Sequence, residues 1–263
     1  MGFLEMKKVS FTYPNGYEAI KNVDLNFEKG ESVAIIGQNG AGKTTTVKLM
    51  NGLLKPSAGS VLVDGVDTKT KTTAQIAKTV GYVFQNPDDQ IFQETIYKEI
   101  SFGLIDKRNP SETVKKRILE SAKLCQLDEV LEEHPYNLPY SKRKFITIAA
   151  IIAMDTQVII LDEPTAGQDR ESTELLGNII TTLKNRGKTV ITITHDMEFV
   201  SKEFQRVIVF SNKEKQYDGL PRDIFWNENL LKKADLKPPF ICQLSQKIGI
   251  ANVISISELI ERI

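Results

Sequence analysis

The sequence has little cysteine. Only Cys125 and Cys242 occur among 263 residues, far apart and in apolar surroundings. Their separation excludes a closely spaced metal-binding pair, and two thiols are too few for the disulfide framework of small secreted domains. We expect both to be inert packing residues.

The chain also lacks net charge and a long apolar run. It has 34 basic and 34 acidic residues, so no overall field attracts it to nucleic acid or to an anionic bilayer. The start, MGFLEMKK, has no apolar signal-peptide stretch, and the longest apolar-rich segment, 145–161, is interrupted by Asp155, Thr156 and Gln157. These features predict a cytoplasmic or membrane-peripheral protein.

Hydrophobic periodicity in the N-terminal third predicts strands followed by a helix. Residues 3–36 alternate between polar and apolar and end in the apolar run VAII, which is typical of antiparallel strands leading into a buried central strand. We expect a helix from Lys43, a hairpin over 59–66 that turns at Asp64-Gly65, and a short strand over 81–85.

The rest of the chain changes pattern twice. From about 92 to 155 the pattern is helical, with Ser111 after Pro110 as the N-cap of one helix. Strands at 158–161, 189–194 and 206–210 then alternate with helices, which predicts a mostly parallel sheet with helices on both faces. We therefore expect an α/β domain over 1–220 with a helical insertion over about 92–155, and a small C-terminal appendage over 221–263 that contains a short helix in SISELIERI.

A phosphate-binding loop lies where the buried strand meets the helix. Residues 37–44, GQNGAGKT, match G-x-x-x-x-G-K-S/T, and average residue usage predicts on the order of 0.01 such matches in a chain of this length. The loop glycines permit main-chain N–H groups to surround phosphates, Lys43 neutralises their charge and Thr44 can bind Mg²⁺. The predicted nucleotide-binding residues of this loop are Gly37, Asn39, Gly40, Ala41, Gly42, Lys43, Thr44 and Thr45.

Two later strands end in polar side chains. The apolar run VIIL delivers Asp162 and Glu163 to the edge where ligands bind in open α/β sheets. Asp162 suits the Mg²⁺ shell, and Glu163 can act as the base for an attacking water. His195 follows the strand TVITIT and can hold the γ-phosphate and the water together. The alternatives are a solvated strand end for the carboxylates and a structural hydrogen bond for the histidine.

These elements, in this order, resemble the ATP-binding-cassette family over about residues 3–220. The resemblance implies an ATPase that uses ATP and Mg²⁺ and acts as a dimer, with two ATP molecules held between two cassettes. It also implies that Tyr13, or less directly Tyr17, stacks on adenine, that Gln85 contacts Mg²⁺ and water, and that Asp169 lies on the loop that crosses between cassettes. An alternative for Asp169 is a helix cap.

The segment at the family's signature position departs from the usual LSGGQ. It reads Leu138, Pro139, Tyr140, Ser141 and Lys142. Pro139 supplies neither a hydroxyl nor an N–H, and Tyr140 adds bulk where glycine permits close approach to phosphate. Ser141 is a candidate cap of the next helix, and Lys142–Lys144 either attract phosphate or form a solvated helix face.

Within the family, the run FQNPDDQIF and the C-terminal segment resemble the ATPase subunits of energy-coupling-factor importers of vitamins and transition-metal ions. This resemblance implies a peripheral position on the cytoplasmic face of the cell membrane, integral membrane subunits and a second cassette as partners, with a heterodimer favoured over a homodimer because of the altered signature. Asp88, Asp89 and Gln90 would then lie near the groove that receives a membrane subunit. The alternatives are a soluble ABC ATPase without a transport role and a nucleotide-sensing scaffold with low turnover.

Overall fold

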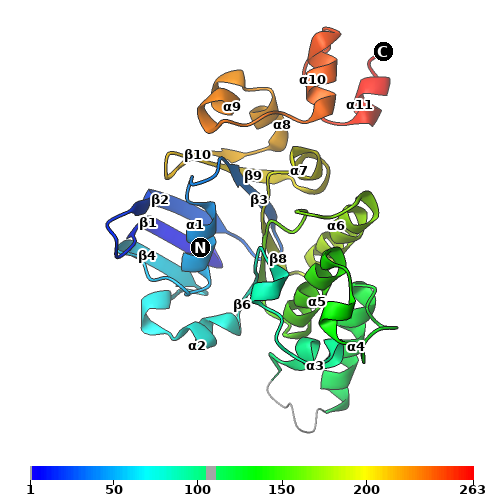
Figure 1. Ribbon diagram of the computed structural model, residues 1–263. Helices are drawn as coiled ribbons and strands as arrows, with labels where there is room; N and C mark the ends of the chain where they lie inside the picture. Colours follow the sequence, from blue (N-terminus) through cyan, green and yellow to red (C-terminus); the bar gives the residue numbers. More distant parts are fainter. Residues whose placement is uncertain (1, 105–110) are drawn as a thin grey trace.

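The structure is a computed structural model that describes residues 2–104 and 111–263 (Figure 1). It confirms the predicted α/β class: an antiparallel sheet of four strands and a mostly parallel sheet of six strands are combined with helices. Pro110 and the rest of 105–110, which belong to the predicted helical insertion, lie outside the described residues.

The antiparallel sheet is formed by the N-terminal region and has the order β2-β1-β4-β5. Its strands are β1 (Leu4–Thr12), β2 (Glu18–Phe27), β4 (Ala58–Val63) and β5 (Val66–Asp67). Asp64 and Gly65 turn the β4–β5 hairpin with φ values of 50° and 76°, the left-handed pair that suits a two-residue turn. The predicted hairpin over 59–66 is confirmed.

The second sheet has the order β10-β9-β3-β8-β7-β6, and only its β9–β10 pair is antiparallel. Its strands are β3 (Ser32–Gly37), β6 (Val80–Val83), β7 (Val158–Asp162), β8 (Thr189–Ile193), β9 (Arg206–Ser211) and β10 (Glu214–Gly219). The strand predicted over 81–85 ends at Val83, because the N–H of Phe84 donates to the side chain of Gln90 instead of to a strand. The carboxyl ends of β3, β6, β7 and β8 share one edge of this sheet.

Each face of the six-stranded sheet has its own hydrophobic core. Val158 and Ile160 of β7 pack in the core shared with the antiparallel sheet and α1 (Lys43–Met50), whereas Ile159 and Leu161 pack in the core on the other face. The second core includes residues of α5 (Tyr140–Ala153) and α6 (Arg170–Asn185). Alternation along β7 therefore directs Asp162 to the same face as Ile160.

Helices account for most of the described part of 92–155. The structure places α3 (Ile96–Ser101), α4 (Glu112–Leu124) and α5 there, and α4 and α3 pack against α5 (Figure 1). The hydroxyl of Ser111 accepts from the N–H of Val114 at 3.4 Å, so Ser111 is the N-cap of α4 as predicted. The smaller helices α2 (Thr73–Ala77) and α7 (Met197–Glu203) follow β5 and β8.

The C-terminal segment contains more helix than its sequence pattern indicates. It forms α8 (Pro221–Phe225), α9 (Glu228–Ala234), α10 (Phe240–Lys247) and α11 (Ile256–Ile260), of which only α11 is predicted by periodicity (Figure 1). Leu231, Cys242 and Val253 are buried in the same core as Leu161 of β7. The segment therefore shares the core of the main domain. No helix in the described parts of the chain is long and apolar enough to span a bilayer.

Candidate functional site

The phosphate loop connects β3 with α1. The helix begins at Lys43, and Gly42 is its N-cap with a φ of 101°. A Cβ atom at Gly42 would lie 2.6 Å from the carbonyl oxygen of Ala19, and one at Gly37 would lie 2.1 Å from that of Phe210. The loop needs glycine at both positions because main-chain atoms approach too closely for any side chain.

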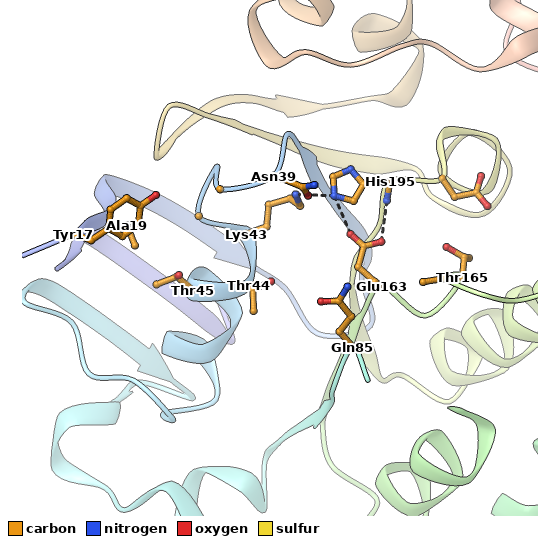
Figure 2. A pocket seen from close by; sticks show the side chains of 14 residues that line it. Tyr17, Ala19, Asn39, Lys43, Thr44, Thr45, Gln85, Glu163, Thr165 and His195 are labelled. Carbon is orange, nitrogen blue, oxygen red and sulfur yellow. Dashed lines mark hydrogen bonds and ion pairs between the residues drawn. The ribbon is translucent and has the colours of Figure 1, made fainter. Parts of the chain in front are cut away.

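A cavity of about 610 Å³ opens beside this loop (Figure 2). Most of the residues predicted to bind nucleotide or to act in catalysis line it: Asn39, Gly40, Gly42, Lys43, Thr44, Thr45, Gln85, Glu163 and His195. Two other loop residues contribute differently, since Ala41 is buried and Gly37 offers its carbonyl oxygen to Lys43. The sheet thus brings residues from distant parts of the sequence to one edge.

Lys43, Glu163 and His195 form a connected group in this cavity (Figure 2). Nε2 of His195 lies 3.1 Å from Nζ of Lys43 and 3.2 Å from Oε1 of Glu163. The main-chain N–H of His195 also donates to Oε2 of Glu163 at 3.2 Å. Nζ of Lys43 donates to the carbonyl oxygens of Gly37 and Gln38 at 2.7 and 3.1 Å. These contacts fix the three side chains relative to the loop.

Burial changes the ionisation of this group. It raises the pKa of Glu163 to about 7, although the ammonium of Lys43 acts in the opposite direction. Burial also lowers the pKa of Lys43, and burial together with the Lys43 charge lowers the pKa of His195. A carboxyl group with a pKa near neutral is suited to accept a proton from an attacking water. A neutral imidazole can accept a hydrogen bond from the Lys43 ammonium.

Asp162 precedes Glu163 but lines a second cavity of about 530 Å³. Its Oδ2 accepts a hydrogen bond from the hydroxyl of Tyr82 at 2.7 Å, and both side chains are buried. Burial raises the pKa of Tyr82, and the charge of Asp162 raises it further, so the phenol keeps its proton. Asp162 therefore has one oxygen engaged by a neutral donor.

The three residues predicted to bind Mg²⁺ meet where the two cavities adjoin. Thr44 and Gln85 line both cavities, and Asp162 lines the second. Oδ1 of Asp162 is buried and has no hydrogen-bond partner among the described residues. Hydroxyl, amide and carboxylate oxygens are the hard donors that Mg²⁺ takes, and a buried carboxylate oxygen without a partner is stabilised by a cation. These three residues therefore fit Mg²⁺. Only one of them is a carboxylate, and within 2–104 and 111–263 no group of three or more His, Cys, Asp or Glu side chains could hold a metal ion.

Of the two tyrosines predicted near adenine, only Tyr17 lines the nucleotide cavity (Figure 2). The Tyr13 and Tyr17 rings are stacked with centroids 6.4 Å apart, and the Tyr13 hydroxyl is 3.1 Å from Oγ1 of Thr45. The ammonium of Lys213 lies 4.7 Å from the centroid of the Tyr17 ring. Tyr13 thus supports Tyr17 and the loop, and Tyr17 presents the exposed aromatic surface.

Lys144 matches neither expectation for the basic run after the signature position. It is 1% exposed, and its Nζ donates to the carbonyl oxygen of Phe84 at 3.0 Å and to that of Gln85. Burial lowers its pKa to about 8. Lys144 therefore does not face solvent, and its ammonium ties α5 to the main chain of the loop that carries Gln85.

The helix after the altered signature begins immediately after Pro139. Pro139 is the N-cap of α5 and makes no side-chain cap bond, whereas Ser141 lies in the first turn. The expectation that Ser141 caps this helix is wrong, because Pro139, with a φ of −59° and a ψ of 153°, already ends the extended segment one residue before the helix. Arg143, one turn into the helix, donates to the carbonyl oxygen of Leu138 at 3.1 Å.

The residues predicted to act across a dimer lie outside the chain's own nucleotide cavity. None of residues 138–142 lines it within the described parts of the chain, and neither does Asp169. Asp169 is the N-cap of α6, where it accepts from the N–H of Ser172 at 2.8 Å, and it is exposed. The side chain of Gln168 donates to the carbonyl oxygen of Ser141 at 3.2 Å. This hydrogen bond connects the signature segment to the residue before Asp169.

Sequence reasoning missed Tyr82 and Thr165 and did not predict the buried contacts of Lys144. The hydroxyl of Thr165 lies 3.1 Å from that of Thr194. The alternation of side chains along each strand could have placed Tyr82 and Asp162 on the same face of the sheet, but only if the two strands were known to be neighbours.

Comparisons with known proteins identify the family of the chain. A sequence model of the family described as ABC transporter matches residues 20–166. The energy-coupling factor transporter ATP-binding protein EcfA of Methanothermobacter thermautotrophicus is 36% identical over 250 residues, which cover 94% of this chain and 80% of the relative. The chain spans less than half the length of several other curated relatives.

Solved structures show the same fold. The structure of cbiO1 from Clostridium perfringens, described as part of the ABC transporter complex cbiONQ, superposes with a TM-score of 0.80 at 28% identity and covers 95% of this chain and 99% of that chain. A dimeric post-hydrolysis state of the ATP-binding cassette MJ0796, bound to ADP and Pi, gives a TM-score of 0.75 at 29% identity and covers 83% of this chain and 98% of that chain.

Proposed function

The chain belongs to the ABC transporter family and is an ATPase of that family, and from this premise we propose that it powers an energy-coupling-factor importer of a vitamin or a transition-metal ion. The observation that carries the proposal is the connected group of Lys43, Glu163 and His195 in the nucleotide cavity. The names of EcfA, an energy-coupling factor transporter ATP-binding protein, and of cbiO1, part of an ABC transporter complex, support the role in a transporter.

In this proposal the chain's own residues bind ATP and prepare a water for attack. Main-chain N–H groups of the phosphate loop and the ammonium of Lys43 hold the phosphates. Glu163 accepts the proton of the water, and His195 orients the γ-phosphate. Thr44, Gln85 and Asp162 would hold Mg²⁺, which when bound neutralises charge on the phosphate oxygens. Tyr17, supported by Tyr13, stacks on the adenine.

The active form in this proposal is a heterodimer of cassettes. None of residues 138–142 lines the chain's own cavity in the described parts of the chain, which supports a role for the signature segment at nucleotide held by a partner. Pro139 supplies no hydroxyl there, while Lys43, Glu163 and His195 are all in place in the chain's own site. A partner with an ordinary signature would therefore complete the productive site. Full ATPase activity in a purified homodimer would contradict the proposal that the active form is a heterodimer.

The membrane partner is proposed to dock beside Gln85, so that nucleotide state reaches it through the loop after β6. Asp88 and Asp89 are exposed there, and Asp88 pairs with Arg143 of α5 at 3.2 Å. Lys144 binds the same loop from α5. Movement of α5 on dimer closure would thus move Gln85 and the docking surface together.

Replacing Glu163 with Gln tests the catalytic assignment. We expect Glu163→Gln to reduce ATP turnover by about 10²–10⁴-fold, the usual contribution of general base catalysis, and to retain bound ATP. Turnover and bound nucleotide are measured in detergent-solubilised complex, with Glu132→Gln on the exposed surface as the matched control. The altered signature favours a nucleotide-sensing scaffold as the alternative. In such a scaffold, neither substitution would change ATP turnover or the amount of bound nucleotide.

A further inference from the structure

Tyr82 joins two neighbouring strands at the proposed magnesium site. It pairs with Ile160 in the parallel β6–β7 ladder, and its hydroxyl donates to Oδ2 of Asp162 at 2.7 Å across 80 positions of sequence. Tyr82 is 7% exposed and Asp162 is 1% exposed. The bond is therefore buried and shielded from competition by water.

This bond distinguishes the two oxygens of the Asp162 carboxylate. Oδ2 is engaged by the phenol, whereas Oδ1 is buried with no hydrogen-bond partner in the described parts of the chain. Asp162, Thr44 and Gln85 line the same cavity of about 530 Å³. A buried carboxylate oxygen requires a donor or a cation, so Oδ1 is the oxygen left for a metal or its bound water.

The tyrosine ring is itself held by the loop that carries Gln85. Its centroid lies 5.0 Å from that of Phe84, with the planes tilted by 50°. The side chain of Gln90 accepts from the N–H of Phe84 at 3.0 Å and donates to the carbonyl oxygen of Tyr82 at 3.5 Å. One loop therefore positions both the phenol and Gln85.

We propose that Tyr82 is a positioning residue for the magnesium site, holding the Asp162 carboxylate so that Oδ1 is directed to the metal that Thr44 and Gln85 also bind. This inference rests on the proposed function, because it takes Asp162 as part of the Mg²⁺ shell. Groups that hydrogen-bond to metal ligands typically change metal affinity 10- to 100-fold when they are removed.

The test compares Tyr82→Phe with Tyr217→Phe in the full chain. The control also removes a tyrosine–aspartate hydrogen bond, an exposed one outside the site, since the Tyr217 hydroxyl donates to Oδ2 of Asp223 at 3.0 Å. Mn²⁺ affinity is measured by electron paramagnetic resonance with a non-hydrolysable ATP analogue bound, and nucleotide affinity is measured separately in EDTA. We expect Tyr82→Phe to weaken Mn²⁺ binding by about 10-fold or more, with nucleotide affinity in EDTA and the control unchanged.

Mn²⁺ affinity of Tyr82→Phe within about two-fold of the wild type would overturn the inference. A wild type that binds neither nucleotide nor Mn²⁺ would instead contradict the proposed function. Since Tyr82→Phe leaves a buried carboxylate oxygen unpaired and can impair folding, 3-fluorotyrosine at position 82 provides a second test that keeps the hydroxyl. Its fluorine resonance is expected to shift when Mg²⁺ joins bound ATP and not when ATP binds in EDTA. An unchanged resonance on addition of Mg²⁺ would overturn the inference.

Discussion

Replacing Pro139 with serine, the residue of the usual signature, should have two separable effects. Pro139 is the N-cap of α5 and provides no side-chain cap, although its φ of −59° and ψ of 153° are open to serine. Pro139→Ser and Pro139→Ala both lose the restriction that proline places on the unfolded chain. Only Pro139→Ser adds a hydroxyl that can accept from an N–H of the first turn, which should make it more stable than Pro139→Ala by about 1 kcal/mol. For a domain of this size that corresponds to a difference of about 2–4 °C in melting temperature between the two variants.

The same substitution should raise hydrolysis in a homodimer, where both composite sites face the altered segment. A single well-placed donor to developing charge contributes about 10²–10³-fold in other enzymes. Tyr140 is 44% exposed, and its hydroxyl donates to Oδ1 of Asn86 over a long distance, 3.5 Å. We therefore expect Pro139→Ser combined with Tyr140→Gly to increase homodimer turnover on the order of 10²-fold.

Turnover is measured in steady-state ATPase assays at saturating MgATP over a range of protein concentrations. Stability is measured in thermal melts of the same samples. Pro139→Ala is the matched control, because it restores the N–H without the hydroxyl and should give neither the cap nor the full gain in rate. A melting temperature of Pro139→Ser above that of Pro139→Ala, as expected, with turnover at the wild-type level would refute the reasoning, because the serine would then be in place without assisting hydrolysis.

Two further predictions concern the adenine surface and the cysteines. Tyr17→Ala should weaken ATP binding by about 1–3 kcal/mol, the usual value of base stacking, and leave the affinity for tripolyphosphate unchanged. Both affinities are measured by fluorescence titration, and equal losses for the two ligands would contradict the stacking role. Because burial raises the pKa of Cys242 to about 11 and also raises that of Cys125, neither thiol should react with iodoacetamide at pH 8 until the chain unfolds. Mass spectrometry of alkylated native protein checks this, and rapid labelling of Cys242 would show that α10 does not stay packed.

The sequence predicts the parts of the fold that depend on local pattern. The strand before Asp162 is predicted by the apolar run VIIL, and the loop and helix around Lys43 are predicted by the loop glycines. Both patterns depend only on residues that are close in sequence. The cap at Ser111 and the turn at Asp64 follow from equally local chemistry.

The elements that sequence reasoning misses depend on contacts between distant segments. The burial of Lys144 requires knowledge that α5 passes the loop after β6, 59 and 60 positions earlier. Three C-terminal helices escape prediction because their apolar residues complete a core that belongs to the main domain. Ser141 looks like a cap in sequence, but the helix already starts at Tyr140.

The most direct test of the account is to purify the tagged chain from gently solubilised membranes of its native host and to identify the proteins recovered in stoichiometric amounts. We expect an integral membrane protein together with a second cassette that carries an ordinary signature. A soluble self-dimer without a membrane partner would contradict it.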